Sequence, residues 1–128
     1  MPHVTVEYTD NLRDDGDIKG LLLKINETLI AEGDAFPIGG IRSRAIELKD
    51  YVIADGTGGN DDAFVHVTLK IGSGRPNEVK MAACDSLFRV LEEHFEKHFA
   101  ERNIAISLEL FEFMYPTYKK NNIHRRYQ

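Results

Sequence analysis

A pattern of strand, helix and strand occurs twice along the chain, and this repeat constrains the fold more than any other feature. The first copy opens with period-2 alternation, which is typical of a half-buried strand. Apolar Val4, Val6 and Tyr8 alternate there with Thr5, Glu7 and Thr9. A helix is predicted next, with Asp17 as its N-cap and Gly33 as its stop, and residues 41–53 are then expected to be extended.

The second copy begins at Ala63, where apolar residues alternate with others as far as Ile71. A long helix is predicted after this strand, capped by Asn77 or Ser73, and a fourth strand is predicted over residues 104–111. The apolar stripe expected on the long helix consists of Cys84, Leu87, Phe88, Leu91, Phe95 and Phe99.

Two βαβ units of this size predict a single domain over residues 1–128. The expected fold class is α+β, with one four-stranded mixed sheet that carries both helices on one face. The other face is then uncovered, although Phe64, Phe111 and Phe113 belong to it. Because an exposed apolar sheet face usually marks an interface, we expect a homo-oligomer closed by cyclic symmetry.

The composition argues against several classes of partner. The formal net charge is -5, whereas general nucleic-acid and membrane-surface binders usually carry a basic excess. We therefore expect no nucleic-acid partner and no membrane association. The single cysteine, Cys84, fits a reducing cytoplasm, and neither a signal peptide nor a transmembrane run is predicted.

Two further patterns do not predict a site. The glycines between Gly56 and Gly59 lack the lysine that a phosphate-binding loop requires. His94 and His98 have a spacing that can bind a metal, but no third ligand is evident. We therefore expect a plain loop, two surface histidines and no metal site.

The N-terminus offers a candidate base. If Met1 is removed, the nitrogen of Pro2 becomes a secondary amine, held by a rigid ring at the end of a strand. If Met1 stays, the same nitrogen is an amide, which does not usefully accept a proton. The simpler interpretation is that Pro2 only begins an edge strand, where proline is tolerated.

Three arginines beside glycine-rich turns are candidates for binding an anion. Arg42 and Arg44 begin an extended segment after Gly40 and point to the same side of it, roughly 7 Å apart. Arg75 follows Gly74 in another turn. Arginine grips carboxylates with two parallel hydrogen bonds. The alternative is that these are surface arginines paired with some of the 21 acidic residues.

Several motifs follow one another along the chain in a definite order and spacing. They are Met1-Pro2-His3, Phe36-Pro37, Gly40-Ile41-Arg42-Ser43-Arg44, Ala54-Asp55-Gly56, Ala63-Phe64-Val65-His66, Thr68-Leu69-Lys70-Ile71-Gly72, Gly74-Arg75, and Asn121-Asn122 before His124. Together these motifs resemble the 5-carboxymethyl-2-hydroxymuconate isomerase family of the tautomerase superfamily, whose hallmark is an N-terminal proline. The resemblance covers essentially the whole chain.

The resemblance implies a trimer of such subunits, with sites at or near the subunit boundaries. It assigns catalytic roles to Pro2, Arg42 and Arg75, and makes Arg44 a weaker candidate for substrate contact beside Arg42 and Arg75. The implied reaction converts a small anionic dienol, 5-carboxymethyl-2-hydroxymuconate, to its 2-oxo isomer in bacterial breakdown of homoprotocatechuate. No cofactor and no metal are implied.

The residues also support this chemistry physically. A free α-amine titrates at about pH 8, and nearby arginines in an apolar surround would lower that pKa toward neutrality, which suits proton shuttling. Two alternatives remain. One is a decarboxylase or hydratase of a smaller unsaturated or 2-oxo acid on the same scaffold, and the other is a non-enzymatic oligomeric binding module.

Overall fold

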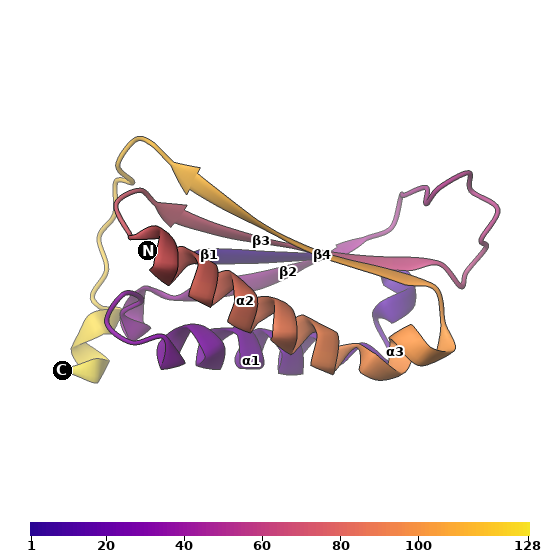
Figure 1. The fold of residues 1–128 in the computed structure, drawn as a ribbon, viewed down its shortest axis with the longest axis horizontal. Helices are drawn as coiled ribbons and strands as arrows, with labels where there is room; N and C mark the ends of the chain where they lie inside the picture. Colours follow the sequence, from indigo (N-terminus) through magenta and orange to yellow (C-terminus); the bar gives the residue numbers. More distant parts are fainter.

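The computed structural model describes all residues from 1 to 128 and consists of one four-stranded sheet with its helices on one side (Figure 1). The strands are β1 (His3–Thr9), β2 (Arg42–Leu48), β3 (Ala63–Gly72) and β4 (Ile104–Phe113). The α-helices are α1 (Ile18–Ala31), α2 (Asn77–His94) and α3 (Glu96–Glu101). Three short 3-10 helices complete the chain: η1 (Asp10–Leu12), η2 (Ile38–Gly40) and η3 (Ile123–Tyr127).

The strand order β2-β1-β3-β4 brings distant parts of the sequence to one end of the sheet. β1 pairs parallel with β2, β3 pairs antiparallel with β1, and β4 pairs parallel with β3. The starts of β1 and β2 therefore lie beside the ends of β3 and β4. The sheet is mixed, as predicted from the sequence.

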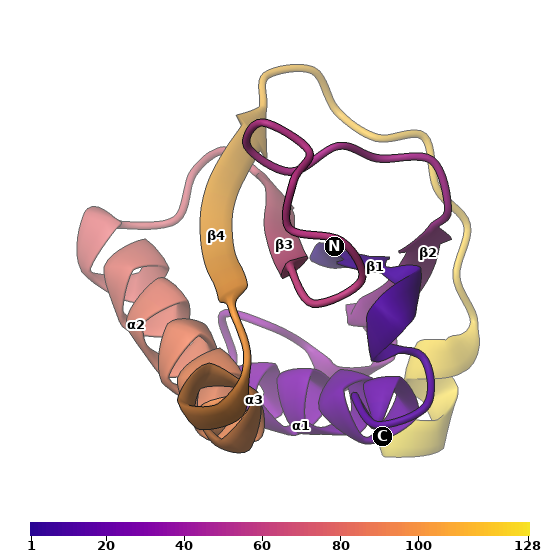
Figure 2. The same cartoon turned by 90° about the vertical axis from the view of Figure 1, so that its right-hand side faces the viewer.

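Both long helices cover the same face of the sheet, as Figure 2 shows. α1 forms where predicted, because the Asp17 side chain accepts a hydrogen bond from the Gly20 amide at 3.2 Å. Gly33, just past its end, has a φ of 90°, which glycine adopts without strain. No helix of this chain combines the length and the apolarity needed to cross a bilayer. The core between helices and sheet consists of Val4, Val6, Leu12, Leu21, Ile25, Leu29, Phe36, Ile41, Ala63, Val65, Val67, Leu69, Ile71, Ala83, Leu87, Leu91 and Phe95.

The second long helix differs from the sequence prediction at both ends. Neither Asn77 nor Ser73 caps it, because Pro76 is the N-cap residue and Asn77 is the first helical residue. The predicted stripe is also interrupted, since α2 ends at His94 and α3 begins at Glu96. Phe99 is thereby turned outward and is 60% exposed.

The open face of the sheet is more polar than the sequence analysis predicts. Phe111 is 52% exposed there, but its neighbour Lys70 lies over its ring, 5.3 Å from the centroid. In the middle of this face, His66 Nε2 lies 2.9 Å from Glu109 Oε1. The uncovered face is thus a mixture of charged and aromatic side chains.

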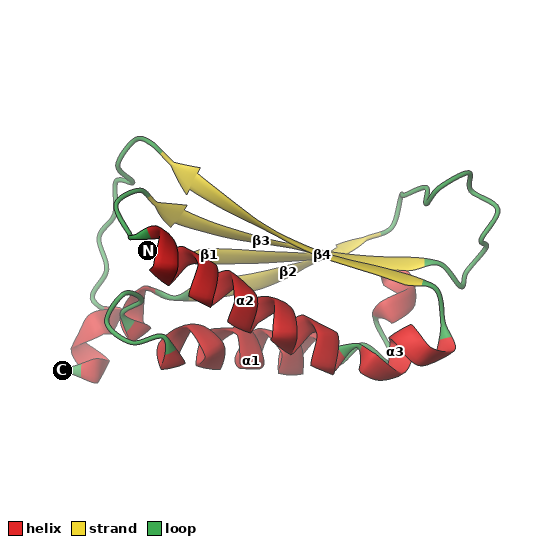
Figure 3. Ribbon diagram, in the orientation of Figure 1, coloured by secondary structure: helices red, strands yellow, loops and turns green.

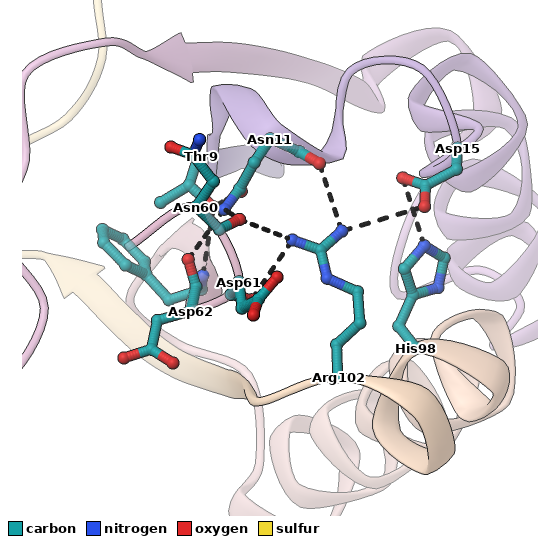
Figure 4. A network of polar contacts seen from close by, with 9 residues as sticks. Thr9, Asn11, Asp15, Asn60, Asp61, Asp62, His98 and Arg102 are labelled. Atoms are coloured by element: carbon teal, nitrogen blue, oxygen red, sulfur yellow. Dashed lines mark hydrogen bonds and ion pairs between the residues drawn. The ribbon is translucent and has the colours of Figure 1, made fainter. Parts of the chain in front are cut away.

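A polar network closes the end of the sheet that is distant from Pro2 (Figure 4). Arg102 donates hydrogen bonds to the carbonyl oxygens of Asn11 at 3.2 Å and Asp61 at 3.2 Å. Asn11 in turn donates to the carbonyl oxygen of Asp62 at 2.7 Å. These bonds fasten the long connection between β2 and β3, which projects beyond the sheet (Figure 3).

The prediction of two surface histidines is wrong at this end of the molecule. His94 Nε2 lies 2.7 Å from the Gly16 carbonyl oxygen, and His98 Nε2 lies 3.4 Å from Asp15 Oδ1. The His98 side chain is only 11% exposed. Both rings are partly buried because the segment after η1 folds back onto α2 and α3, which helical spacing alone does not reveal.

We expect Arg102→Ala to lower the free energy of unfolding by about 1–3 kcal/mol, because it leaves several backbone carbonyls without their charged donor. The rate of any reaction at the other end of the sheet should stay the same. Urea denaturation measures the first quantity. Arg89→Ala is the matched control, since Arg89 is an exposed arginine on α2; an equal loss in both variants would refute the proposed role of the network.

Candidate active site

Pro2, Arg42 and Arg75 lie at the same end of the sheet, although they are far apart in the sequence. Pro2 directly precedes β1, and Arg42 is the first residue of β2, the parallel neighbour. β3 runs the opposite way and ends at Gly72, so the turn that holds Arg75 also lies here. The strand order therefore accounts for the proximity of all three.

Pro2 is buried and its backbone is part of the sheet. The amide of Arg42 donates a hydrogen bond to the Pro2 carbonyl oxygen at 3.1 Å, which begins the pairing of β1 with β2. The Arg42 guanidinium Nη1 lies 2.7 Å from the sulfur of Met1. The side chain of Arg42 thus points toward the start of the chain.

Arg75 is held in a fixed orientation by three contacts. Its Nε donates to the Ala35 carbonyl oxygen at 3.0 Å, and its Nη1 donates to the Gly72 carbonyl oxygen at 3.5 Å. Its guanidinium also lies over the buried ring of Phe36, 4.8 Å from the centroid. A guanidinium has five N–H donors, so donors remain for a carboxylate.

Arg44 lies on the same side of β2 as Arg42, as predicted, but further from the sheet end. Its register partner is Thr5, whereas that of Arg42 is His3. Arg44 is exposed, and its Nη1 lies 3.2 Å from His3 Nδ1. Burial, followed by the charges of Arg44 and Arg42, lowers the pKa of His3. Arg44 therefore lies beside the pair formed by Arg42 and Arg75 and is not part of it.

The electrostatics at this end disfavour a protonated amine. Burial is the largest cause of a lowered pKa at the N-terminal amine of Met1, followed by the charges of Lys119, Arg75 and Arg42. When Met1 is absent, the amine is the nitrogen of Pro2, one peptide unit further into the same buried position. The arrangement can therefore hold a neutral amine beside cations that attract an anion.

The sequence analysis did not single out two neighbours of this site. Phe36, beneath Arg75, appeared only as part of a motif and not as a platform for the guanidinium. Lys119, in the C-terminal tail, was assigned no role there. No local pattern points to Lys119, because its position depends on the path of the whole tail.

The family model described as 5-carboxymethyl-2-hydroxymuconate isomerase matches residues 2–127 of the chain. The chain belongs to this family. The 5-carboxymethyl-2-hydroxymuconate Delta-isomerase of Escherichia coli is 44% identical over 126 residues, which are 97% of this chain and 97% of the relative. A crystal structure of a 5-carboxymethyl-2-hydroxymuconate isomerase from Deinococcus radiodurans R1 superposes with a TM-score of 0.93 at 51% identity, covering 99% of this chain and 94% of that one.

This member of the isomerase family also shares its fold with more distant proteins. The wild-type fused 4-OT named W0, a symmetric trimer, superposes with a TM-score of 0.65 at 17% identity. The superposition covers 88% of this chain and 87% of that one, and at this identity it shows the fold alone. The four-stranded mixed sheet predicted from the two βαβ units is confirmed, and so is the tautomerase-like fold that the family resemblance implied.

Proposed function

We propose that this chain is a 5-carboxymethyl-2-hydroxymuconate Delta-isomerase that uses Pro2, freed of Met1, as its acid–base group. The observation that carries the proposal is a buried Pro2 at the end of the sheet that also holds Arg42 and Arg75, in a member of that isomerase family. We place the activity in bacterial homoprotocatechuate breakdown and in the cytoplasm. The partner is a small anionic metabolite, and neither nucleic acid nor membrane takes part.

The reaction moves one proton. The amine of Pro2 removes the proton from the 2-hydroxyl group, so the O–H bond breaks and an oxyanion forms at C2. The electrons shift along the 2,4-diene, leaving a C2=O carbonyl and a double bond between C3 and C4. The ammonium of Pro2 then returns the same proton to C5, which restores the free amine.

The arginines supply positive charge at a carboxylate of the substrate and at the C2 oxygen. A guanidinium binds a carboxylate through parallel N–H donors, and donors already in place stabilise the developing charge on the C2 oxygen. Arg75 is suited to a fixed position because Ala35, Gly72 and Phe36 hold it. Arg42 and Arg75 are thus proposed as catalytic and substrate-binding groups, and Arg44 as an outer substrate contact.

We infer that the subunits form a homotrimer. The open face carries exposed Phe111, β2 and β4 leave their outer edges unpaired, and the similar fused 4-OT is a symmetric trimer. Sedimentation equilibrium should give a mass three times the 14.6 kDa of one chain. A monomer at micromolar concentration would contradict the trimer.

The alternative reactions are tested by a panel of substrates. Protein whose intact mass confirms the loss of Met1 is mixed with 5-carboxymethyl-2-hydroxymuconate, and the loss of the conjugated dienol is followed by ultraviolet absorbance. Rapid conversion to the 2-oxo isomer supports the proposal. Turnover only of smaller unsaturated or 2-oxo acids would favour the decarboxylase or hydratase, and binding without turnover would favour the binding module.

The pH dependence of kcat/KM should report the protonation of the Pro2 amine. Only the neutral amine accepts a proton, so kcat/KM is expected to rise with pH through the pKa of Pro2 and then level off. Burial and the charges of Lys119, Arg75 and Arg42 lower the pKa of the Met1 amine below its ordinary value of 8.0. The Pro2 amine would lie in the same surroundings, so we expect the midpoint below 8.0 as well. Initial rates measured across a buffer series give the midpoint; a value at or above 8 would contradict the assignment.

A further inference from the structure

The C-terminal tail crosses the end of the sheet where Pro2 lies. After β4 ends at Phe113, the tail runs from the β4 edge toward η2 and the end of α1 (Figures 1 and 2). Asn121 anchors it there, because its Nδ2 donates to the Gly39 carbonyl oxygen at 2.8 Å. The amide of Ile123 donates to Asn121 Oδ1, also at 2.8 Å, which holds the anchoring side chain in place.

The tail approaches η2 so closely that position 39 has no room for a side chain, whereas position 40 is in ordinary contact distance. A Cβ atom on Gly39 would lie 2.7 Å from His124 Nδ1 and 2.8 Å from His124 Cα. A Cβ atom on Gly40 would lie 3.7 Å from His124 Cε1 and 3.5 Å from Met1 Cγ. The tail, the turn that leads into Arg42 and the start of the chain therefore meet at these two glycines.

This anchor determines where Lys119 lies. Lys119 precedes Asn121 by two residues, so its Cα is within about 7 Å of an anchored residue. It has no ion-pair partner in the chain. Of the three cations that lower the N-terminal pKa, Lys119 acts more strongly than Arg75 and Arg42, and its neighbour Lys120 is not among them.

We propose that Lys119 is a third substrate-binding cation of the active site, held over the start of β1 by the Asn121 anchor. This inference rests on the proposed isomerase function. The proposed substrate has three carboxylates, and Lys119, Arg42 and Arg75 offer three positive charges. The ammonium of Lys119 is a point charge at the end of a flexible four-carbon side chain, whereas the guanidinium of Arg75 is planar and held in one orientation.

The test compares Lys119→Met with Lys120→Met in protein that lacks Met1. Losing a charged contact to the substrate should lower kcat/KM for 5-carboxymethyl-2-hydroxymuconate by about 10- to 100-fold, mainly through KM. Removing a positive charge near the amine should also move the acidic limb of the pH profile to higher pH. Lys120→Met should change neither quantity, and Lys119→Arg should restore both in large part.

Two outcomes separate this inference from the proposed function. If the parent protein converts the substrate but Lys119→Met and Lys120→Met behave alike, Lys119 is an ordinary surface lysine and the inference is overturned. If the parent protein does not convert the substrate at all, the proposed function itself has failed. Equal melting temperatures of the three variants and the parent exclude a loss of folding as the cause.

Discussion

Protein that retains Met1 is expected to convert 5-carboxymethyl-2-hydroxymuconate about 10²- to 10⁴-fold more slowly than protein that begins at Pro2, because general acid–base catalysis contributes a factor of that size. With Met1 present, the nitrogen of Pro2 is an amide without a usable lone pair, and the side chain of Met1 contacts Arg42. The measurement is the ultraviolet assay on two preparations whose masses establish the state of the N-terminus.

The two preparations should otherwise be indistinguishable. Met1 lies before the start of β1 and is not part of a strand, so the melting temperature and the oligomeric state should be the same in both. Replacing Pro2 by Ala, with Met1 removed, leaves a primary amine and should also reduce the rate steeply. Equal rates with and without Met1 would remove Pro2 from the mechanism.

Arg42→Ala is expected to lower kcat/KM by about 10²- to 10³-fold, the usual cost of removing a donor that stabilises an oxyanion. The guanidinium of Arg42 points at the start of the chain, whereas Arg44, the other arginine of β2, contacts His3. Steady-state kinetics, together with a melting curve to verify folding, measure the effect.

Arg44→Ala is the matched control for that experiment. Arg44 is on the same strand and the same face, two residues further along, and it contacts His3 instead of the N-terminus. We expect its loss to change kcat/KM by less than about 10-fold, as for an exposed charge. If both variants lost activity equally, the contribution of Arg42 would be a general positive field and not a specific contact.

Much of the fold could be predicted from the sequence because its patterns are local. Alternation around Val4 and Val65 identified strands, and Asp17 and Gly33 marked the ends of α1. The grouping of Pro2 with Arg42 also follows from a βαβ unit, since two parallel neighbouring strands begin at the same edge. Family resemblance joined Arg75 to this pair; the structure explains its place by the antiparallel pairing of β3 with β1.

The remaining features depend on interactions between distant segments. Helical spacing extended the buried stripe to Phe99, but the helix breaks at Phe95, whose φ of -104° and ψ of 17° change the direction of the chain. The polar partners of His66 on β4 become visible only when the strands are in register. Likewise, nothing near Lys119 in the sequence indicates that Asn121 fastens the tail to η2.

The burial of Pro2 at the start of β1 limits where another protein or a tag can be fused to this chain. If the reactive nitrogen is the first atom of the polypeptide, any domain or purification tag added before it preserves the sheet and removes the base. Gln128, by contrast, is exposed and directly follows η3. On the proposed mechanism, fusion partners can therefore be added only after Gln128, and the removal of Met1 is required before the protein is active.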